Sequence, residues 1–364
     1  MKILSESELE YLVFNYCTRC GFCNTACPIY EVFSRLETKG PRGRILLARG
    51  VAENLFDINS VVEEFYSCAL CGGCYVKCPA GLDTMSIVLT LRKNLAQKSL
   101  VPRSLRKLIA NVLDKGNIFG KTPVKETPRK GTILYWRGCM NIFRVPELSK
   151  AQYTLLKKLG VNVYTVSEVC CGSPLILAGF IDEAKKIAEL VANILESANP
   201  QFIVTGCPSC LHCFTKLYPE VLGIELPFEI KHISQLLNEL LSFRNNPEPV
   251  EEIVYHDPCE LARHCGIINE PREVLRKVGY KVIELKKRGL EATCCGGGGL
   301  LWGLYTEYAL KAALIKLRNE ILPLGLHKVI TACPTCLLNF KYSAILHDID
   351  IEVKDLAEAI LEKL

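Results

Sequence analysis

One cysteine pattern occurs twice in this chain, and it constrains the fold more than any other feature. Each copy has a lone cysteine, an adjacent cysteine pair followed by glycine, and a Cys-Pro-x-Cys group. The first copy contains Cys139, Cys170, Cys171, Cys207 and Cys210. The second copy contains Cys259, Cys294, Cys295, Cys333 and Cys336. Because the spacing and the segments between the cysteines match, this part of the chain is predicted to be a duplicated domain.

Apolar strand-like segments alternate with helix-like segments in both copies. Strands are expected at residues 132–135, 161–166 and 202–205, and again at 253–255, 281–285 and 327–331. Helices are expected at residues 146–159 and 181–197, and again at 270–278 and 305–321. This alternation predicts α/β, Rossmann-like units with parallel sheets. Ligands of such sheets gather beyond the carboxyl ends of the strands, which is where the cysteines fall.

The amino-terminal part carries two runs of the spacing Cys-x2-Cys-x2-Cys-x3-Cys-Pro, which is typical of bacterial ferredoxins. In two-cluster ferredoxins the fourth cysteine of each run binds the other cluster. One [4Fe–4S] cluster is therefore predicted on Cys17, Cys20, Cys23 and Cys78. The other is predicted on Cys68, Cys71, Cys74 and Cys27. A zinc site needs four ligands and does not explain two such runs.

The residues around these two runs have helical rather than β periodicity. Helices are expected at residues 5–16, 44–54, 58–66, 84–97 and 102–113. The sequence therefore predicts a helical two-cluster ferredoxin domain at 1–120, a linker at 121–131, and two repeated α/β domains at 132–246 and 247–364. Arg42 and Arg44 precede one of these helices, and they lie either beside a cluster or in a solvated helix start.

Three interpretations account for five thiols in each α/β repeat. A tetrahedral zinc ion has room for only four of them. A Cys-Pro-x-Cys dithiol at a helix start uses two and leaves three without a role. A polynuclear iron–sulfur cluster uses all five, because a thiolate can bridge two irons.

Twenty cysteines in a 364-residue chain favour metal or redox use over disulfides, since disulfide frameworks belong to small secreted domains. The first residues contain acids and no apolar signal core, and no apolar run approaches the length of a spanning helix. A cytoplasmic location is expected, with any contact at the inner face of the membrane made through a partner. The net charge of +5 is spread along the chain, which argues against nucleic-acid binding.

With these motifs in place, the chain resembles the CCG-domain iron–sulfur oxidoreductases. Its order of domains is similar to the D-type subunit of heterodisulfide reductase and to the iron–sulfur subunit of glycolate oxidase. The resemblance covers nearly the whole chain and implies that each complete CCG motif holds a noncubane [4Fe–4S] cluster at the substrate site. By that resemblance, one such cluster is bound by Cys139, Cys170, Cys171, Cys207 and Cys210. The second is bound by Cys259, Cys294, Cys295, Cys333 and Cys336.

The resemblance implies an oxidoreductase subunit that moves electrons between the ferredoxin clusters and the CCG sites, with reductive cleavage of a disulfide as in heterodisulfide reductase. The alternative is an electron relay for a flavin-dependent glycolate, lactate or glycerol-3-phosphate dehydrogenase. A hypothesis of a different class is a non-enzymatic scaffold stabilised by zinc or clusters. The sequence has no flavin or nicotinamide motif, so a flavoprotein or a membrane cytochrome is expected as partner.

Three further features have more modest interpretations. Cys213 and Cys265 lack counterparts in the other repeat and are expected to be buried structural thiols. The glycines at 296–299 lack the residues of a phosphate loop and are expected to let the backbone approach a bulky cluster. His212 and His256 flank cluster cysteines, and they either move protons or pack beside the clusters.

Overall fold

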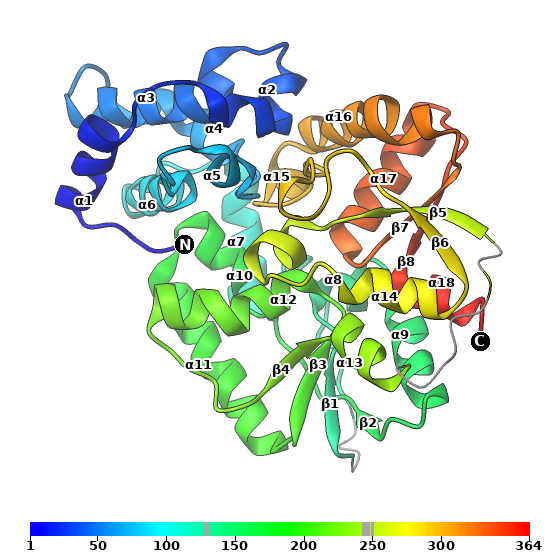
Figure 1. Cartoon of the computed structure of the whole chain (residues 1–364). Helices are drawn as coiled ribbons and strands as arrows, with labels where there is room; N and C mark the ends of the chain where they lie inside the picture. The colour runs from blue at the N-terminus through cyan, green and yellow to red at the C-terminus, as the bar shows by residue number, and fades with distance from the viewer. Residues whose placement is uncertain (127–130, 242–247, 249–250) are drawn as a thin grey trace.

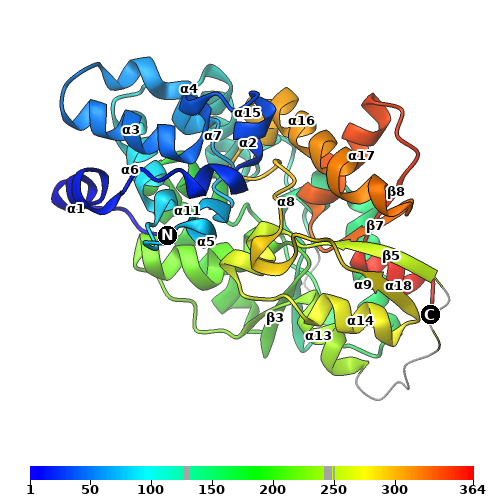
Figure 2. The ribbon, with the colours of Figure 1, turned by 45° about the horizontal axis from the view of Figure 1, so that its top comes forward.

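The computed structural model describes residues 1–126, 131–241, 248 and 251–364. The predicted linker at 121–131 and the boundary near 246 lie partly outside the described residues. A helical amino-terminal part packs against two α/β units, as Figure 1 shows with the blue and cyan helices above the green unit and beside the yellow-to-red unit. The turned view in Figure 2 shows the same arrangement, with α2 beside α16.

The amino-terminal part is built from short helices joined by cysteine-rich loops. These helices are α1 (Glu6–Tyr11), α2 (Pro28–Val32), α3 (Pro41–Ala52), α4 (Val62–Tyr66), α5 (Gly73–Lys77), α6 (Thr84–Gln97) and α7 (Arg103–Lys115). Ser5 caps α1 through a capping box with Glu8, and Asp83 caps α6. The predicted helices at 84–97 and 102–113 are confirmed. The helix expected at 5–16 changes to π geometry after Tyr11, at Leu12–Tyr16, immediately before Cys17.

The first α/β unit is a four-stranded parallel sheet in the order β2-β1-β3-β4. Its strands are β1 (Ile133–Trp136), β2 (Val163–Tyr164), β3 (Phe202–Thr205) and β4 (Ile230–His232). Its helices are α8 (Cys139–Phe143), α9 (Pro146–Lys158), α10 (Ser173–Ala178), α11 (Ile181–Ala198), α12 (Pro208–His212) and α13 (Ile233–Leu240). The strand expected at 161–166 is reduced to two residues, because only Val163 and Tyr164 pair with β1.

The second unit repeats this topology in the order β6-β5-β7-β8, again with parallel pairing throughout. Its strands are β5 (Glu251–His256), β6 (Tyr280–Ile283), β7 (Lys328–Thr331) and β8 (Glu352–Asp355). Its helices are α14 (Glu270–Lys277), α15 (Leu301–Leu304), α16 (Thr306–Lys316), α17 (Pro334–Leu346) and α18 (Leu356–Leu361). The predicted α/β class with parallel sheets and a helical cluster-binding part is confirmed.

The fourth strand of each sheet was not predicted. β4 reads Ile-Lys-His and β8 reads Glu-Val-Lys-Asp, so neither has the apolar run of a central strand. Both are edge strands, where charged side chains are common because one side of the strand faces solvent. Each leads directly into a short helix that begins with a capping box, at His232 and at Asp355.

The three parts share their cores. One apolar cluster joins side chains of α6 and α7 to α10 and α11 of the first unit, and another joins both α/β units through Tyr135, Val204 and Tyr255. Arg92 is fully buried where all three parts meet, and its guanidinium donates to the carbonyl oxygens of Cys68 (2.7 Å), Leu177 (2.8 Å) and Gly299 (3.1 Å). These contacts position the cysteine loops relative to one another.

Candidate functional site

The structure brings four cysteines of the amino-terminal part together around one small cavity. These are Cys17, Cys20, Cys23 and Cys78. Burial and the neighbouring thiols of Cys17 and Cys78 raise the pKa of Cys23 to about 12. Four thiolates so close together repel one another, and a cationic centre between them removes that repulsion. This donor set therefore fits a [4Fe–4S] cluster.

A second cavity beside it is surrounded by the other four cysteines of the two runs. These are Cys27, Cys68, Cys71 and Cys74. Burial raises the pKa of Cys27 to about 11, and burial with the thiols of Cys71 and Cys68 raises that of Cys74. The fourth cysteine of each run thus lies with the first three of the other run. This is the same grouping that the sequence predicts for the cluster ligands.

Arg42 and Arg44 each lie beside one of these cavities. Arg42 lines the first cavity and pairs with Glu37 at 2.6 Å. Arg44 lines the second, where its buried guanidinium donates to the carbonyl oxygen of Glu64 at 2.6 Å. Of the two sequence interpretations, the geometry agrees with arginines beside the cluster positions.

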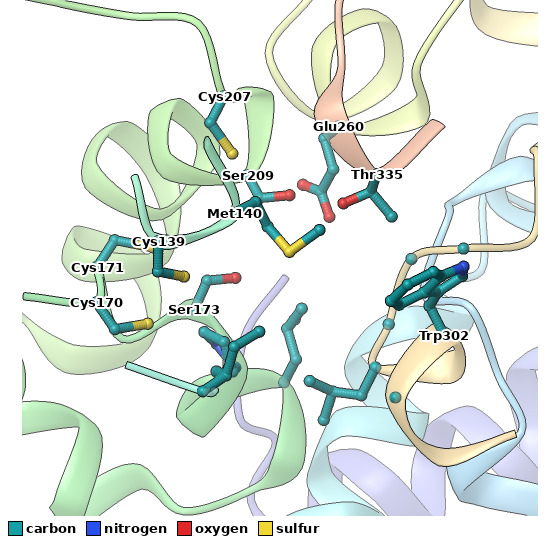
Figure 3. Close-up of a pocket in the computed structure, with 18 of the residues that line it drawn as sticks. Cys139, Met140, Cys170, Cys171, Ser173, Cys207, Ser209, Glu260, Trp302 and Thr335 are labelled. Carbon is teal, nitrogen blue, oxygen red and sulfur yellow. The ribbon is translucent and has the colours of Figure 1, made fainter. Parts of the chain in front are cut away.

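The five cysteines of the first α/β unit converge at the carboxyl end of its sheet. Cys139 begins α8 directly after β1, the adjacent pair precedes α10, and Cys207 precedes α12, which carries Cys210. Gly138 has a φ of +81°, and a Cβ there would lie 2.9 Å from the Cys210 sulfur, so glycine is needed to bring α8 close. Figure 3 shows Cys139, Cys170, Cys171 and Cys207 on one side of a pocket.

The second unit gathers its five cysteines in the same way. The sulfurs of Cys295 and Cys336 are 3.2 Å apart, and those of Cys294 and Cys259 are 3.8 Å apart. Hydrogen bonds from Cys294 and Cys336 lower the pKa of Cys295, while the pKa of Cys336 is raised. The backbone N–H of Gly297 also points at the Cys295 sulfur, at 3.4 Å. The surroundings of Cys295 therefore favour the thiolate form of this residue.

Both sets of cysteines face a single cavity of about 430 Å³. All five cysteines of the first unit line it, together with all those of the second except Cys294. The remaining wall includes Leu108, Phe119 and Trp302, with Glu260 and the exposed Lys107 as charged groups. Figure 3 shows Glu260, Thr335 and Trp302 on the opposite side of this pocket from the first unit's cysteines. The fold thus places two five-thiol sites across one largely apolar chamber.

The second ferredoxin-type cavity lies directly against the second unit. Cys71 has a pKa raised well above its usual range, chiefly because its thiol hydrogen-bonds to Cys294. Arg263 spans this boundary and donates to the carbonyl oxygens of Cys71 at 2.5 Å and Ala292 at 2.6 Å. Among the described residues, no contact of this kind joins a ferredoxin-type cysteine to a cysteine of the first unit.

The last two glycines of the run at 296–299 lie at this boundary. A Cβ on Gly299, whose φ is +59°, would lie 2.6 Å from the Cys68 carbonyl oxygen. A Cβ on Gly298 would lie 3.2 Å from the Ala69 carbonyl oxygen and 4.0 Å from the Cys259 sulfur. The sequence predicts an approach of this backbone to a cluster, which stays a prediction. What the structure shows is that Gly298 and Gly299 lie against the ferredoxin loop, a contact between distant parts of the chain that a linear sequence cannot reveal.

A buried polar network that the sequence did not predict joins the three parts of the chain. Nδ1 of His212 lies 2.5 Å from an oxygen of Glu260, and the His212 ring stacks on His264 at 4.5 Å. Nε2 of His264 bonds the carbonyl oxygen of Leu70 at 3.0 Å. Burial opposes the charge on Glu260, but His212 holds the pKa of this carboxyl below its ordinary value. His212 is thus paired, not free, beside the cavity.

The two unmatched cysteines have different surroundings. Cys213 is fully buried, and its sulfur donates to the Cys171 carbonyl oxygen at 3.1 Å. Asn339, its counterpart in the second unit, donates to the Cys295 carbonyl oxygen at 2.7 Å. Each therefore fixes the same backbone position in its own unit, which agrees with a structural role for Cys213. Cys265 is half-buried rather than buried.

Comparisons with known proteins agree with this architecture. A family model described as a 4Fe-4S dicluster domain matches residues 13–82, and one described as a cysteine-rich domain matches residues 133–215 and 253–341. Among the described residues, no helix has both the length and the apolar character needed to cross a membrane.

Several curated proteins are similar over most of the chain. The D-type subunit of dihydromethanophenazine:CoB--CoM heterodisulfide reductase from Methanosarcina acetivorans is 29% identical, covering 98% of this chain and 96% of that protein. The B-type subunit of fumarate reductase (CoM/CoB) from Methanothermobacter marburgensis is 28% identical over 94% of this chain and 71% of its own length. EtfAB:quinone oxidoreductase of Syntrophomonas wolfei is 26% identical, covering 90% of this chain and 55% of that protein.

A solved structure shares the fold at low identity. The crystal structure of a hypothetical protein from Helicobacter pylori superposes with a TM-score of 0.64 at 12% identity, covering 98% of this chain and 74% of that one. The first two of these relatives are subunits of redox enzymes, and the cluster-binding and cysteine-rich models together span both halves of the site. The chain therefore belongs to the CCG-domain iron–sulfur oxidoreductases, as an electron-transfer subunit like the D-type subunit of heterodisulfide reductase.

Proposed function

We propose that this subunit passes electrons through two ferredoxin-type [4Fe–4S] clusters to or from two noncubane [4Fe–4S] centres, and that these centres reductively cleave a disulfide in the cavity between them. The observation that carries the proposal is the single cavity of about 430 Å³ lined by cysteines of both α/β units. Cleavage breaks one sulfur–sulfur bond, consumes two electrons and two protons, and releases two thiols. A site with an iron–sulfur centre on each side suits a substrate with two sulfur atoms.

The proposed ligands are the eighteen cysteines named by the two motifs. The ferredoxin-type clusters take Cys17, Cys20, Cys23 and Cys78, and Cys27, Cys68, Cys71 and Cys74. The cavity centres take the two five-cysteine sets, Cys139, Cys170, Cys171, Cys207 and Cys210, and Cys259, Cys294, Cys295, Cys333 and Cys336. When bound, these groups supply one-electron transfer and iron atoms that hold sulfur. The same proposal divides the chain at the predicted boundaries 1–120, 132–246 and 247–364, which agrees with one sheet in each α/β unit.

The chain's own residues prepare the cavity for this chemistry. Leu108, Phe119 and Trp302 form an apolar wall that displaces water around the reacting sulfurs. The His212–Glu260 pair holds its carboxylate on the cavity surface, beside the Cys259 position. The exposed Lys107 supplies a positive charge for an anionic part of the substrate.

We place electron exchange with a partner at the end of the amino-terminal part that lies away from the cavity. Cys20 is exposed, and the aromatic rings of Tyr16 and Phe22 beside it are 38% and 61% exposed. Aromatic residues are enriched where proteins dock. We place the flavoprotein or membrane cytochrome partner on this surface, in the cytoplasm, with any contact to the membrane made by the partner.

The similarity to EtfAB:quinone oxidoreductase favours a second candidate. In it the chain relays electrons for a larger complex that oxidises a 2-hydroxyacid or glycerol 3-phosphate, and the cavity centres react with no disulfide. To separate the two, protein reduced anaerobically is mixed with a panel of small aliphatic disulfides. Reoxidation of the clusters with release of two thiols per two electrons supports the first candidate. Clusters that stay reduced in the presence of every disulfide of the panel support the electron-relay role.

Cofactor content tests the assignment of the centres. Anaerobically prepared protein should carry about sixteen irons, four for each of four clusters. About eight irons in fully reconstituted protein would mean that the cavity sites hold no such clusters. Zinc without iron and sulfide would instead support the scaffold hypothesis.

A substitution separates a cluster from a dithiol in the second unit. Cys294→Ser should remove or alter the centre of this unit, with loss of up to about four irons, while the electron paramagnetic resonance (EPR) signal of the cluster at Cys17 remains. If Cys333 and Cys336 cycle alone as a dithiol, this variant keeps its full iron content and Cys333→Ser carries the whole defect.

A further inference from the structure

The strands β1 and β5 end in different buried side chains, which lie beside the cysteines of the two α/β units. Trp136 ends β1, and His256 occupies the corresponding end of β5. Each ring is packed edge-on against a phenylalanine at matching places in the repeat. Trp136 lies 5.3 Å from Phe214 at an interplanar angle of 81°, and His256 lies 4.8 Å from Phe340 at 86°. The two positions are therefore structurally equivalent.

The ring nitrogens of both side chains lack hydrogen-bond partners among the described residues. Trp136 and His256 are both fully buried. Nε1 of Trp136, and both Nδ1 and Nε2 of His256, have no hydrogen-bond partner among the described residues. An unsatisfied buried polar group destabilises the folded state, so such groups are uncommon and need an explanation. The explanation has to account for one nitrogen in the first unit and two in the second.

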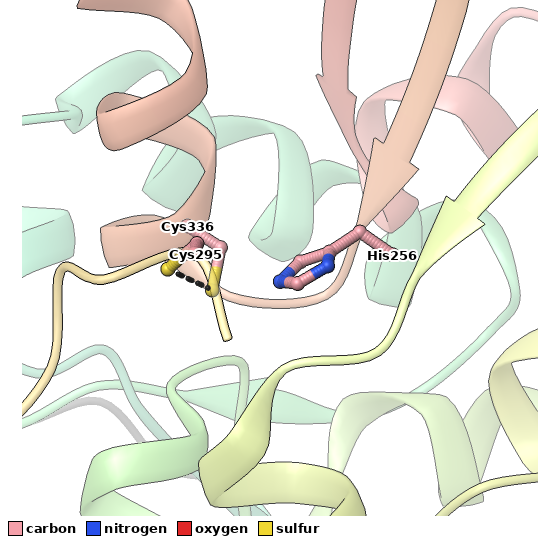
Figure 4. A group of neighbouring side chains, drawn as sticks. All are labelled: His256, Cys295 and Cys336. Atoms are coloured by element: carbon pink, nitrogen blue, oxygen red, sulfur yellow. Dashed lines mark hydrogen bonds between the residues drawn. The ribbon is translucent and has the colours of Figure 1, made fainter. Parts of the chain in front are cut away.

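His256 lies beside two of the predicted cluster ligands. A ring nitrogen of His256 and the sulfurs of Cys295 and Cys336 all lie within 4.8 Å of one another. Figure 4 shows the imidazole at the end of β5 directed toward these two cysteines. A nitrogen and two sulfurs gathered this closely could hold one metal atom.

The chemistry of the two rings explains why the units differ. An indole nitrogen carries a hydrogen and donates only, so Trp136 can give a hydrogen bond to a cluster sulfur but cannot bind iron. A neutral imidazole has one N–H and one lone pair, and the lone pair can bind iron. His256 is fully buried and neither of its ring nitrogens has a hydrogen-bond partner among the described residues, so no other protein group occupies the lone pair.

We propose that His256 is a nitrogen ligand of the iron–sulfur centre in the second unit, whereas the centre of the first unit has thiolate ligands only. The inference rests on the proposed function, since it requires a centre on Cys259, Cys294, Cys295, Cys333 and Cys336. An imidazole adds a ligand without adding negative charge, and histidine ligation raises the potential of other iron–sulfur centres. The second centre, which faces the ferredoxin module through Cys71, is then the easier of the two to reduce.

The test uses full-length protein in which histidine alone carries nitrogen-15. Electron–nuclear double resonance of the paramagnetic centre should show strong coupling to one histidine nitrogen. His256→Phe should lose this coupling, and the matched change Trp136→Phe in the first unit should leave it unchanged. In His256→Gly, prepared from unlabelled protein, added nitrogen-15 imidazole should restore it.

Iron and sulfide analysis distinguishes a failure of histidine ligation from a failure of the proposed function. A full iron content with no strong nitrogen coupling, or with coupling that persists in His256→Phe, overturns histidine ligation and leaves the proposed function standing. Weak coupling alone shows a hydrogen bond to a sulfur and also overturns ligation. A second unit without iron in the unsubstituted protein overturns the proposed function itself.

Discussion

Arg263 places a positive charge between a ferredoxin-type cysteine and a cavity cysteine. Its guanidinium is directed at three carbonyl oxygens, those of Cys71, Leu290 and Ala292. Its Nη2 has no partner among the described residues, and the sulfurs of Cys71 and Cys259 lie close enough to interact with its charge. Phe143 stands at the corresponding place in the first unit. The charge therefore acts on one boundary only.

Replacing this residue should change the electronic properties of both neighbouring centres. Arg263→Met removes a cation that stabilises their reduced, more negative states, so their reduction potentials should fall by roughly tens of millivolts. Redox titration followed by EPR measures the shift. Arg106→Met, at an exposed position on α7, is the control and should leave the potentials unchanged. Equal potentials in the Arg263 variant and the native protein would contradict this role.

At the scale of elements, the loop before α15 meets the loop that carries Cys68 with almost no space between their backbones. Gly299→Ala should separate these loops, because its Cβ would lie 2.5 Å from the backbone of Ala69. Electron exchange between the ferredoxin-type clusters and the cavity centres should become slower, as measured by EPR of samples frozen at short times after mixing with a reductant.

Gly325→Ala is the matched control for this change. Gly325 also has a positive φ, +69°, but no atom within 4 Å of the Cβ position. Both variants carry a similar cost of backbone strain, so any difference between them comes from the contact between the loops. Equal rates of electron exchange in the two variants would rule out the role of this contact.

The junction between β8 and α18 contains a carboxyl group whose pKa is raised. Burial raises the pKa of Asp355 from 3.8 to about 7. The folded state therefore binds its proton more tightly than the unfolded state, and the contribution of Asp355 to stability is lost as the pH rises from about 4 to 7. The loss is of the order of a few kcal/mol.

Asp355→Asn should remove this pH dependence while keeping an oxygen acceptor for the Ala357 N–H, which caps α18. Hydrogen exchange of the β8 and α18 amides, corrected for the intrinsic rate, measures the local stability. Protection in the native protein should decrease between pH 5 and pH 8, and protection in the variant should change little. A native protein with constant protection over this range would contradict the raised pKa.

At the scale of the whole molecule, the cysteine sites form a sequence from the surface to the cavity. The site with the exposed Cys20 comes first, the site with Cys71 lies against the second α/β unit, and the cavity comes last. Because electron transfer slows steeply with distance, an electron that enters at the surface should need the middle cluster to reach the cavity.

Cys74→Ser should interrupt this sequence. The middle cluster should be lost or altered, and reduction of the cavity centres by a protein-sized electron donor should become much slower. Cys265→Ser changes a half-buried cysteine outside both motifs and should leave the rate unchanged. Stopped-flow absorbance with a reduced ferredoxin as donor measures both variants. An unchanged rate in Cys74→Ser would show that electrons enter the cavity by another path.

The repeated α/β architecture and the grouping of the cysteines could both be predicted from the amino-acid sequence. Strand ends, helix periodicity and the two ferredoxin-type runs are local patterns, and local patterns follow from backbone geometry and side-chain spacing. The exchange of Cys27 and Cys78 between the two runs could be predicted because the spacing has a known geometric consequence. The short polar strands β4 and β8 could not, since edge strands need no apolar run.

The way in which the three parts meet could not be predicted from the sequence and is known from the folded structure alone. The facing of the two five-cysteine sets across one cavity, the contact of Cys71 with Cys294, and the His212–Glu260 pair each join residues far apart in the chain. Such contacts depend on the packing of whole units, and a single sequence carries no local signal for them. The same holds for His256, whose unpaired nitrogens become visible only when its buried surroundings are known.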